Sequence, residues 1–151
     1  MTESFDLEKG EFTITTERER LDVDAIHAYL TRAYWSEGVP RETVARAIAN
    51  SVCFGVFRGS EQIGLARVVT DSATYAYLCD VYILEEYRGK GLGTWLMECV
   101  MGHASLQGLR RFSVATRDAH GLYRKFGFRE LAKPQSQMEI HRPEIYKEVK
   151  R

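Results

Sequence analysis

The sequence predicts an α/β fold, with four helices flanking a mixed, mostly antiparallel sheet of about seven strands. Its 151 residues are 44% hydrophobic and 28% charged, which suits a single domain over residues 1–151. Apolar residues recur at the spacing of strands or of helices along the chain. The predicted order is strand, two helices, three strands, helix, strand, helix, two strands. This pattern runs from about residue 11 to residue 141 without an internal repeat or a low-complexity tract.

The first three elements each have their own signal. Residues 11–17 alternate apolar and polar side chains, as a half-buried strand does. A helix is expected from about Asp22, because apolar residues recur at helical spacing as far as Tyr34 behind an acidic first turn. Pro40 suits the first turn of a second helix, which runs on to Asn50.

Three strands come next. Residues 52–58 and 62–70 are apolar runs joined by Gly59-Ser60-Glu61, which predicts a hairpin. Residues 74–84 form a third run that is apolar on both faces, so it is expected at the centre of the sheet. Strict alternation places Tyr75, Tyr77, Cys79, Val81 and Ile83 on one face and Ala76, Leu78, Tyr82 and Leu84 on the other.

The carboxyl-terminal part alternates helices with short strands. An amphipathic helix is expected from Gly91 to near Gly108. Residues 112–115 then predict a strand, and residues 118–126 predict a helix closed by Gly127. Residues 128–132 and 137–141 predict the last two strands.

Composition excludes several classes of function. Lys plus Arg and Asp plus Glu each total 21, so the chain offers no general attraction for nucleic acid. No apolar run reaches the ~20 residues that span a bilayer, and the amino terminus lacks a signal-peptide pattern, so a cytoplasmic location and no membrane partner are expected. The three cysteines are interpreted as reduced thiols, and the four histidines are too scattered for a zinc site, so no metal is expected.

The most informative segment is a strand that enters a basic, glycine-rich turn before a helix, over residues 80–94. Such a turn presents backbone N–H groups and the positive end of a helix to an anion, which predicts a pyrophosphate site. Gly89, Gly91 and Gly93 allow close approach of the backbone, and Arg88 and Lys90 add positive charge. The spacing is neither that of a Walker loop nor that of a dinucleotide fingerprint.

Two motifs carry a resemblance to a known family. Arg88-x-x-Gly91-x-Gly93 resembles the acetyl-CoA signature of the GNAT superfamily of acyl-CoA-dependent N-acetyltransferases. Ala119-x-x-Leu122-Tyr123-x-x-x-Gly127-Phe128 looks like that superfamily's carboxyl-terminal helix-to-strand motif. With the order of elements, the resemblance covers residues from about 11 to 141.

The resemblance implies a set of site residues. Acetyl-CoA is the implied acyl donor, with its pyrophosphate on Arg88, Gly89, Lys90, Gly91, Leu92, Gly93 and Thr94 and its pantetheine arm on the backbone of Val81, Tyr82 and Ile83. Tyr123 is the implied general acid that protonates the leaving thiolate. Asp118, which stands where the superfamily often has an asparagine, is also implied to bind the cofactor, and Glu85 stands where the superfamily often has a proline.

Several residues keep two interpretations. Asp80 is either a general base with a pKa raised by burial or a carboxylate held by backbone donors. Tyr34 and Trp35 either line the acceptor pocket or pack at the end of a helix. His120 is expected to be solvated, Glu85 and Glu86 are expected at a solvated loop edge, and Cys79 is expected to be a core residue rather than a nucleophile.

The predicted function is therefore transfer of acetyl from acetyl-CoA to a primary amine of a small molecule or of an amino-terminal peptide, by direct attack in a ternary complex. A non-catalytic acyl-CoA-binding sensor is the alternative, and a partner-binding module is a third. By analogy with the superfamily, the last strands and the tail, residues 143–151, are candidates for a homodimer interface.

Overall fold

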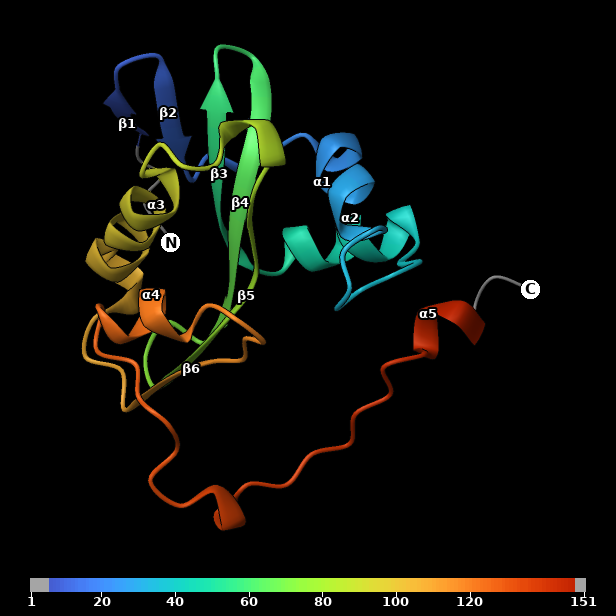
Figure 1. Ribbon diagram of the computed structural model, residues 1–151, viewed down its shortest axis with the longest axis vertical. Helices are drawn as coiled ribbons and strands as arrows, with labels where there is room; N and C mark the ends of the chain where they lie inside the picture. The colour runs from blue at the N-terminus through green and yellow to red at the C-terminus, as the bar shows by residue number, and fades with distance from the viewer. Residues whose placement is uncertain (1–5, 149–151) are drawn as a thin grey trace.

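The computed structural model describes residues 6–148, in which six strands form a single sheet ordered β1-β2-β3-β4-β5-β6 (Figure 1). Every neighbouring pair is antiparallel except β5 and β6, which are parallel. The strands are β1 (Asp6–Lys9), β2 (Phe12–Thr15), β3 (Val52–Arg58), β4 (Glu61–Thr70), β5 (Tyr75–Ile83) and β6 (Arg111–Val114). The α-helices are α1 (Val23–Leu30), α2 (Arg41–Ala49), α3 (Leu92–Gly102), α4 (His120–Arg124) and α5 (Ile145–Glu148).

Local sequence explains where the longer helices begin. The side chain of Asp22 accepts a hydrogen bond from the Ala25 amide and so caps α1, while Pro40 precedes α2 with an extended backbone. The helix α3 begins after Gly91, whose φ of 79° places it in the left-handed region that glycine enters without strain. No side chain caps α3, so its first amide groups stay available to a ligand.

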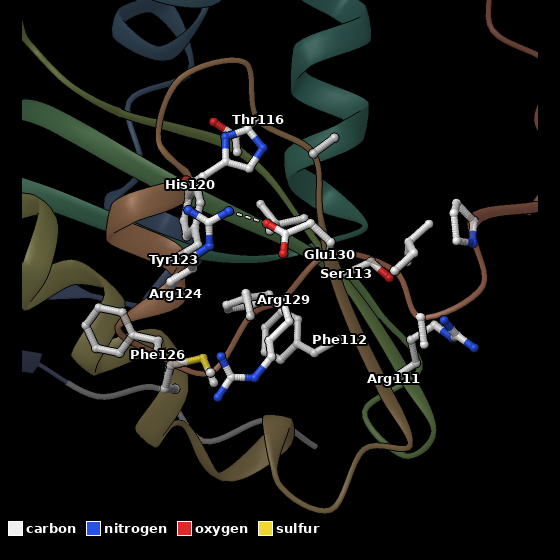
Figure 2. A pocket seen from close by; sticks show the side chains of 18 of the residues that line it. Arg111, Phe112, Ser113, Thr116, His120, Tyr123, Arg124, Phe126, Arg129 and Glu130 are labelled. Carbon is white, nitrogen blue, oxygen red and sulfur yellow. Dashed lines mark hydrogen bonds and ion pairs between the residues drawn. The ribbon is translucent and has the colours of Figure 1, made fainter.

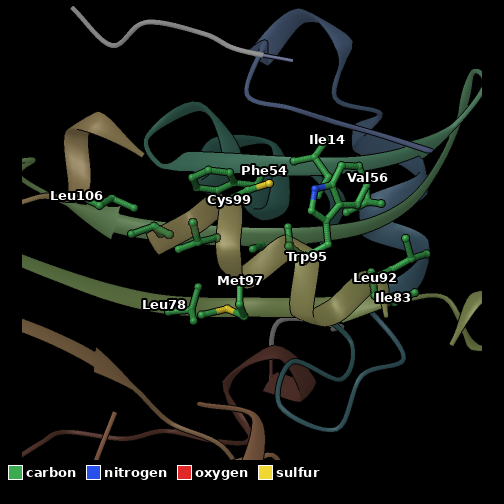
Figure 3. Packing of buried hydrophobic residues seen from close by; sticks show 14 of the residues in the cluster. Ile14, Phe54, Val56, Leu78, Ile83, Leu92, Trp95, Met97, Cys99 and Leu106 are labelled. Atoms are coloured by element: carbon green, nitrogen blue, oxygen red, sulfur yellow. The ribbon is translucent and has the colours of Figure 1, made fainter. Parts of the chain in front are cut away.

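The sheet separates two hydrophobic clusters. The helix α3 packs on one face, where Trp95, Leu96 and Met97 meet Phe54 and Leu78 (Figure 3). The helices α1 and α2 pack on the other face, where their apolar residues meet Leu65 and Tyr82. The sheet is thus covered on both faces, which explains the buried pattern of its central strands.

A β-bulge in β5 changes the predicted alternation. The ladder between β4 and β5 passes from Arg67↔Cys79 directly to Leu65↔Tyr82, so Asp80 and Val81 together oppose one residue of β4. Asp80 takes a φ of 50°, an uncommon left-handed conformation for a residue other than glycine. The prediction that Ile83 faces away from Leu78 is wrong, because the extra residue places both side chains in the cluster under α3 and Tyr82 in the opposite cluster.

The strand count differs from the predicted seven in three places. Strand β1 was not predicted, because all four of its side chains are exposed and it forms only as a hairpin with β2. Residues 128–132 and 137–141 were predicted as strands and form no ladder. Phe128 packs on Phe112, but the residues that follow it are exposed and separated from β6 by a groove.

The described residues form five α-helices rather than the predicted four, because α5 was not expected. The helix α1 ends at Leu30 rather than near Tyr34, and two further helices are shorter than predicted. The helix α3 ends at Gly102 rather than near Gly108, because His103 is extended and its Nδ1 accepts from the Ser105 amide to start a separate turn. The helix α4 spans five residues rather than 118–126, since its last turn loosens before Gly127, which has a φ of 97°.

Candidate active site

A cavity of about 740 Å³ lies where β5 and β6 diverge. Their parallel ladder covers only Tyr75–Leu78 of β5 and Arg111–Val114 of β6. Beyond it, the cavity is lined on one side by residues 79–81 and on the other by residues 114–119. The bulge at Asp80 lies at the start of this opening, so the divergence follows from one inserted residue in β5.

The open edge of β5 can pair with an extended, amide-containing group. Val81 lines the cavity, whereas Tyr82 and Ile83 are not part of its lining and their side chains are buried in the two clusters. Binding of the pantetheine arm by the backbone of Tyr82 and Ile83 therefore stays a prediction. The Ile83 carbonyl already accepts a hydrogen bond from Arg88 Nε at 2.9 Å. An added arm therefore finds its main partner at Val81.

The glycine-rich turn leads from β5 into α3 and faces open space. Gly89 and Gly91 have φ values of 81° and 79°, and a Cβ at Gly89, Gly91 or Gly93 would have no heavy atom within 4 Å. A larger residue would thus fill space beside the free amides of α3, and at Gly89 or Gly91 it would also strain the backbone. This open cradle of amides at a helix start fits a phosphate group.

Arg88 is exposed, but its guanidinium holds the turn in place. Its Nε donates to the Ile83 carbonyl, and its Nη2 donates to the Tyr29 hydroxyl at 2.9 Å. The side-chain charge that the sequence assigned to phosphate binding is therefore engaged in fixing the turn to β5 and α1. Backbone amides and the exposed Lys90 remain for an anion.

Tyr123 reaches the cavity from α4. The residue is 7% exposed and packs edge-on against Phe128, with ring centroids 5.8 Å apart. Burial, together with the nearby Tyr34 and Asp118, raises the pKa of the Tyr123 phenol to about 12. The phenol is therefore neutral at physiological pH and has a proton to donate.

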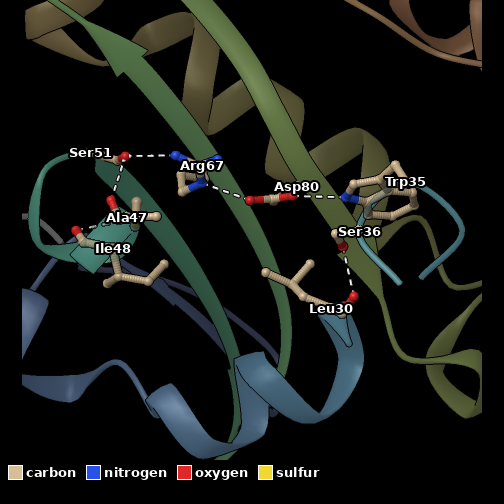
Figure 4. A network of polar contacts seen from close by, with 9 residues as sticks. Leu30, Trp35, Ser36, Ala47, Ile48, Ser51, Arg67 and Asp80 are labelled. Atoms are coloured by element: carbon tan, nitrogen blue, oxygen red, sulfur yellow. Dashed lines mark hydrogen bonds and ion pairs between the residues drawn. The ribbon is translucent and has the colours of Figure 1, made fainter. Parts of the chain in front are cut away.

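Asp80 is held by a polar network that ties the bulge to three other elements (Figure 4). Its Oδ2 accepts from Arg67 Nε at 2.7 Å, and its Oδ1 accepts from Trp35 Nε1 at 2.8 Å. Arg67 also donates to the Ser51 hydroxyl at 3.0 Å, and that hydroxyl donates to the Ala47 carbonyl. The donors to Asp80 are thus side chains from β4 and from the loop after α1. The prediction of backbone donors is wrong.

Arg67 is the site residue that sequence reasoning missed. Its side chain is 18% exposed, that of Asp80 is 11% exposed, and both line the cavity. A cation inside an otherwise apolar strand was the available signal, since such a charge needs a partner and Asp80 is the acid of the neighbouring strand.

Tyr34 and Trp35 line the cavity from the loop after α1. They are 52% and 40% exposed, so they are not core residues of the helix end. Arg117 stacks over the Tyr34 ring, with its guanidinium carbon 3.8 Å from the centroid, and Asp118 lies beside it in the same lining. Aromatic faces and carboxylates therefore meet at the mouth of the cavity.

The other residues considered from the sequence lie outside the cavity or have pKa values that make them unreactive. His120 lines a different groove, beside β6. Glu85 forms a two-pronged contact with Arg32, whose hydrogen bond lowers the Glu85 pKa to about 2 and makes this carboxylate a poor base. The expectation that Cys79 is a core residue is wrong, because it is only partly buried and lines the cavity, where burial raises the pKa of its thiol to about 12. Among residues 6–148, no group of His, Cys, Asp and Glu is arranged to hold a metal ion.

Comparison with known proteins identifies the family. Residues 18–128 match the family described as the acetyltransferase (GNAT) family. The chain belongs to the GNAT family. This chain is 34% identical to a candidate acetyltransferase of Gibberella zeae, FG08082, and the match covers 78% of each of the two chains.

Solved structures show the same fold. A candidate GNAT acetyltransferase from Xanthomonas campestris is 47% identical, covers 89% of this chain and 96% of its own, and superposes with a TM-score of 0.88. A GNAT acetyltransferase from Elizabethkingia anophelis, solved with acetyl-CoA bound, is 18% identical, covers 80% of this chain and 78% of its own, and has a TM-score of 0.61. In the part of the chain that the structure describes, no helix is long and apolar enough to cross a membrane.

Proposed function

We propose that this GNAT protein transfers acetyl from acetyl-CoA to a primary amine within a ternary complex. The observation that carries the proposal is the cavity at the divergence of β5 and β6, which brings together a protonated tyrosine, an open strand edge and a buried acid. Acetyl-CoA, when bound, supplies an activated thioester and a thiolate leaving group. An acyl-transfer site needs little more than positioning, a polarising donor and a route for protons.

The residues of the chain would hold the donor at two places. The amides of residues 88–94 receive the pyrophosphate, and the open edge of β5 near Val81 pairs with the pantetheine arm. Support also comes from the family, since relatives from Elizabethkingia anophelis and Clostridium acetobutylicum were solved with acetyl-CoA. A backbone N–H of β5 polarises the thioester carbonyl.

Proton movements complete the proposed reaction. The amine nitrogen forms the new bond to the acetyl carbon, the carbon–sulfur bond breaks, and Tyr123 gives its phenolic proton to the departing sulfur. Asp80, through the lone pairs not used by Arg67 and Trp35, takes the proton that the amine loses, directly or through water. Solvent then returns that proton to Tyr123, so the products are an amide and a thiol.

The acceptor is a small amine or an amino-terminal peptide. Asp118 and Glu139 line the cavity beside Arg117, while Arg67 pairs with Asp80, so the lining offers carboxylates to an amine without a strong net charge. Tyr34 and Trp35 provide flat apolar faces for the rest of the acceptor. The cytoplasmic location, the single domain over residues 1–151 and the homodimer remain predictions, and residues 1–5 and 149–151 lie outside the described part of the chain.

The first test is thermal unfolding with increasing acetyl-CoA, beside the variant Gly91→Asp. A ligand that binds only the folded state at ~100 times its dissociation constant adds ~2.7 kcal/mol of stability. We expect a saturable rise in melting temperature that Gly91→Asp loses, because the variant places a negative side chain in the phosphate cradle. Gly108→Asp, a positive-φ glycine outside this turn, is the matched control for backbone strain.

Release of thiol in the presence of an amine panel separates the enzyme from a sensor. Turnover with any amine supports the transferase. A clear melting shift with no turnover on any amine would favour the acyl-CoA sensor. No shift in the wild-type protein would overturn the assignment of the phosphate cradle and favour a partner-binding module.

A further inference from the structure

Arg67 uses only part of its guanidinium group to hold the bulge. Its Nε donates to Asp80 Oδ2 and its Nη1 donates to the Ser51 hydroxyl, whereas Nη2 has no hydrogen-bond partner among the described residues. In residues 6–148, no side-chain nitrogen or oxygen of a non-exposed residue is both shut off from solvent and without a partner. Because Arg67 is half-buried and lines the active-site cavity, Nη2 must be accessible from that cavity.

Asp80 also keeps some of its hydrogen-bonding capacity. Its Oδ1 accepts one hydrogen bond from Trp35 and its Oδ2 accepts one from Arg67, while a carboxylate has about four lone-pair sites. Asp80 lines the same cavity as Arg67. The cavity therefore meets an unused cationic donor and an unused anionic acceptor on two side chains that are hydrogen-bonded to each other.

A ligand that matches both groups carries an amine and an acid close together. An α-amino acid fits this description, because its amine and its carboxylate are attached to one carbon atom. A diamine would place a second cation beside Arg67, which costs energy in a site that is largely removed from water. A plain amine would leave Nη2 without a charged partner.

We propose that the acceptor is a free α-amino acid, whose carboxylate accepts from Arg67 Nη2 while its amine lies at Asp80. This inference rests on the proposed acetyl transfer and names its substrate class. The amine nitrogen bonds to the acetyl carbon, the carbon–sulfur bond breaks, and one proton passes in net terms from nitrogen to sulfur. The products are an N-acetyl amino acid and the thiol of coenzyme A.

The rest of the cavity lining favours an uncharged, apolar side chain on this amino acid. Arg117 and Asp118 lie 3.9 Å apart and offset each other's charge, and Glu139 and His141 belong to an exposed segment, residues 133–144, here called the arm. Towards α2 the lining is mostly apolar. It consists there of Val39, Thr43, Val44, Ala47 and Ile48.

The larger groove beside β6 has an ion pair of a different kind (Figure 2). This groove has a volume of about 860 Å³, and Arg111, Arg124 and Arg129 line it. Its pair of Arg124 and Glu130 is exposed on both sides, so water screens the two charges. A carboxylate gains more from the partly buried Arg67, which is why the acceptor site is assigned to the cavity.

The test compares acceptors that differ only in the acid group. L-Phenylalanine, L-phenylalaninamide and 2-phenylethylamine form one series, and L-leucine with 3-methylbutylamine forms a second. Thiol release from acetyl-CoA is expressed per concentration of free amine, so that differences in amine pKa do not contribute. We expect kcat/KM for each amino acid to exceed that of its amine ~10- to 100-fold, as a hydrogen bond to a charged group does.

The amide separates a free amino acid from an amino-terminal peptide. L-Phenylalaninamide offers a carbonyl oxygen, as a peptide does, but no negative charge, and we expect a kcat/KM below that of phenylalanine. A preference for the amide would overturn the free amino acid and indicate a peptide acceptor. Equal values of kcat/KM for an amino acid and its amine would overturn the carboxylate site itself.

Arg67→Lys distinguishes ligand binding from the structural role of this residue. Lysine keeps a charge for Asp80 but lacks the planar fork that reaches two acceptors at once, so the preference for the amino acid should fall close to one. A purely structural role would lower the rates of both acceptors equally and leave the ratio unchanged, which contradicts the proposal.

Two further variants act as controls for the ratio. Ser51→Ala disturbs the same network without removing Nη2, and Arg117→Gln removes the other arginine of the cavity lining. Both should keep the preference for the amino acid. Loss of the preference in Arg117→Gln alone would place the carboxylate at the mouth of the cavity and overturn its assignment to Arg67.

Calorimetry in the presence of coenzyme A measures acceptor binding without turnover. Tighter binding of an amino acid than of its amine, lost in Arg67→Lys, supports the carboxylate site. If that result came with no acetylation of any amine, the proposed transfer would fail while the binding site stood. Equal binding of amino acid and amine, or no binding of any acceptor, overturns the inference whatever acetyl-CoA does.

Discussion

The sheet is interrupted in two places, and the two interruptions are built differently. At the end of β5, the bulge at Asp80 is braced by Arg67, Trp35 and Ser51, so the opening beside Val81 is maintained by the chain itself. At the edge of β6, the groove is bordered by the packing of Phe128 on Phe112 and by the exposed pair of Arg124 and Glu130, with no buried ion pair, and the segment with the pattern of a strand lies exposed. A braced opening suits a small ligand, because it stays open without one.

The largest effect is expected from Tyr123→Phe, which tests whether the opening beside Val81 is a catalytic site. We expect turnover to fall ~100-fold or more, because the leaving sulfur loses its proton donor, while the acetyl-CoA dissociation constant changes little. Steady-state kinetics and a binding titration measure the two quantities separately. Tyr75→Phe removes a hydroxyl from the same sheet outside the cavity and should match the wild type. Equal turnover in both variants would remove Tyr123 from the mechanism.

The bracing itself is tested by Arg67→Met. The variant leaves Asp80 as a nearly buried carboxylate that keeps the hydrogen bond from Trp35 but has no cation beside it, so the free energy of unfolding should fall by about 3 kcal/mol. Arg58→Met removes an arginine paired with Glu11 at the surface and should cost below ~1 kcal/mol. Urea denaturation gives both values. Adding Asp80→Asn to Arg67→Met should recover part of the loss, and no recovery would show that the arginine acts without its partner.

The single variant Asp80→Asn tests whether Asp80, besides its structural role in the bulge, also accepts a proton from the amine. The amide keeps much of the shape of Asp80 but takes up no proton at physiological pH. If Asp80 accepts the amine proton, the ~10-fold loss of turnover should shrink as pH rises toward the amine pKa, because the free amine is then abundant. Tyr123 keeps its proton over this range, since its pKa is raised to about 12, so it does not produce the trend. A loss that is constant with pH would make Asp80 a positioning residue only.

The strength of each sequence pattern explains which features could be predicted. The hairpin of β3 and β4 and the glycine-rich turn before α3 follow from local signals, and the structure contains both. Tyr123 was indicated by the family resemblance alone, and its role as general acid stays a prediction. The bulge at Asp80 leaves no mark in an apolar run, because one extra residue changes register without changing composition. Residues 128–132 and 137–141 have strand patterns, but a strand also needs a partner, and that depends on the rest of the sheet.

The smallest effects are expected from removing one serine hydroxyl beside the bulge and one in the exposed segment that follows β6. Ser51→Ala removes the hydroxyl that accepts from Arg67 and donates to the Ala47 carbonyl, and should cost about 1 kcal/mol of unfolding free energy. Ser136→Ala removes a hydroxyl that donates to the Lys133 carbonyl in the exposed arm, and should cost below ~0.5 kcal/mol, because water replaces that bond. Chemical denaturation at one protein concentration compares them. Equal costs would mean that the arm unfolds with the domain as firmly as the braced bulge does, and the contrast between the two openings would fail.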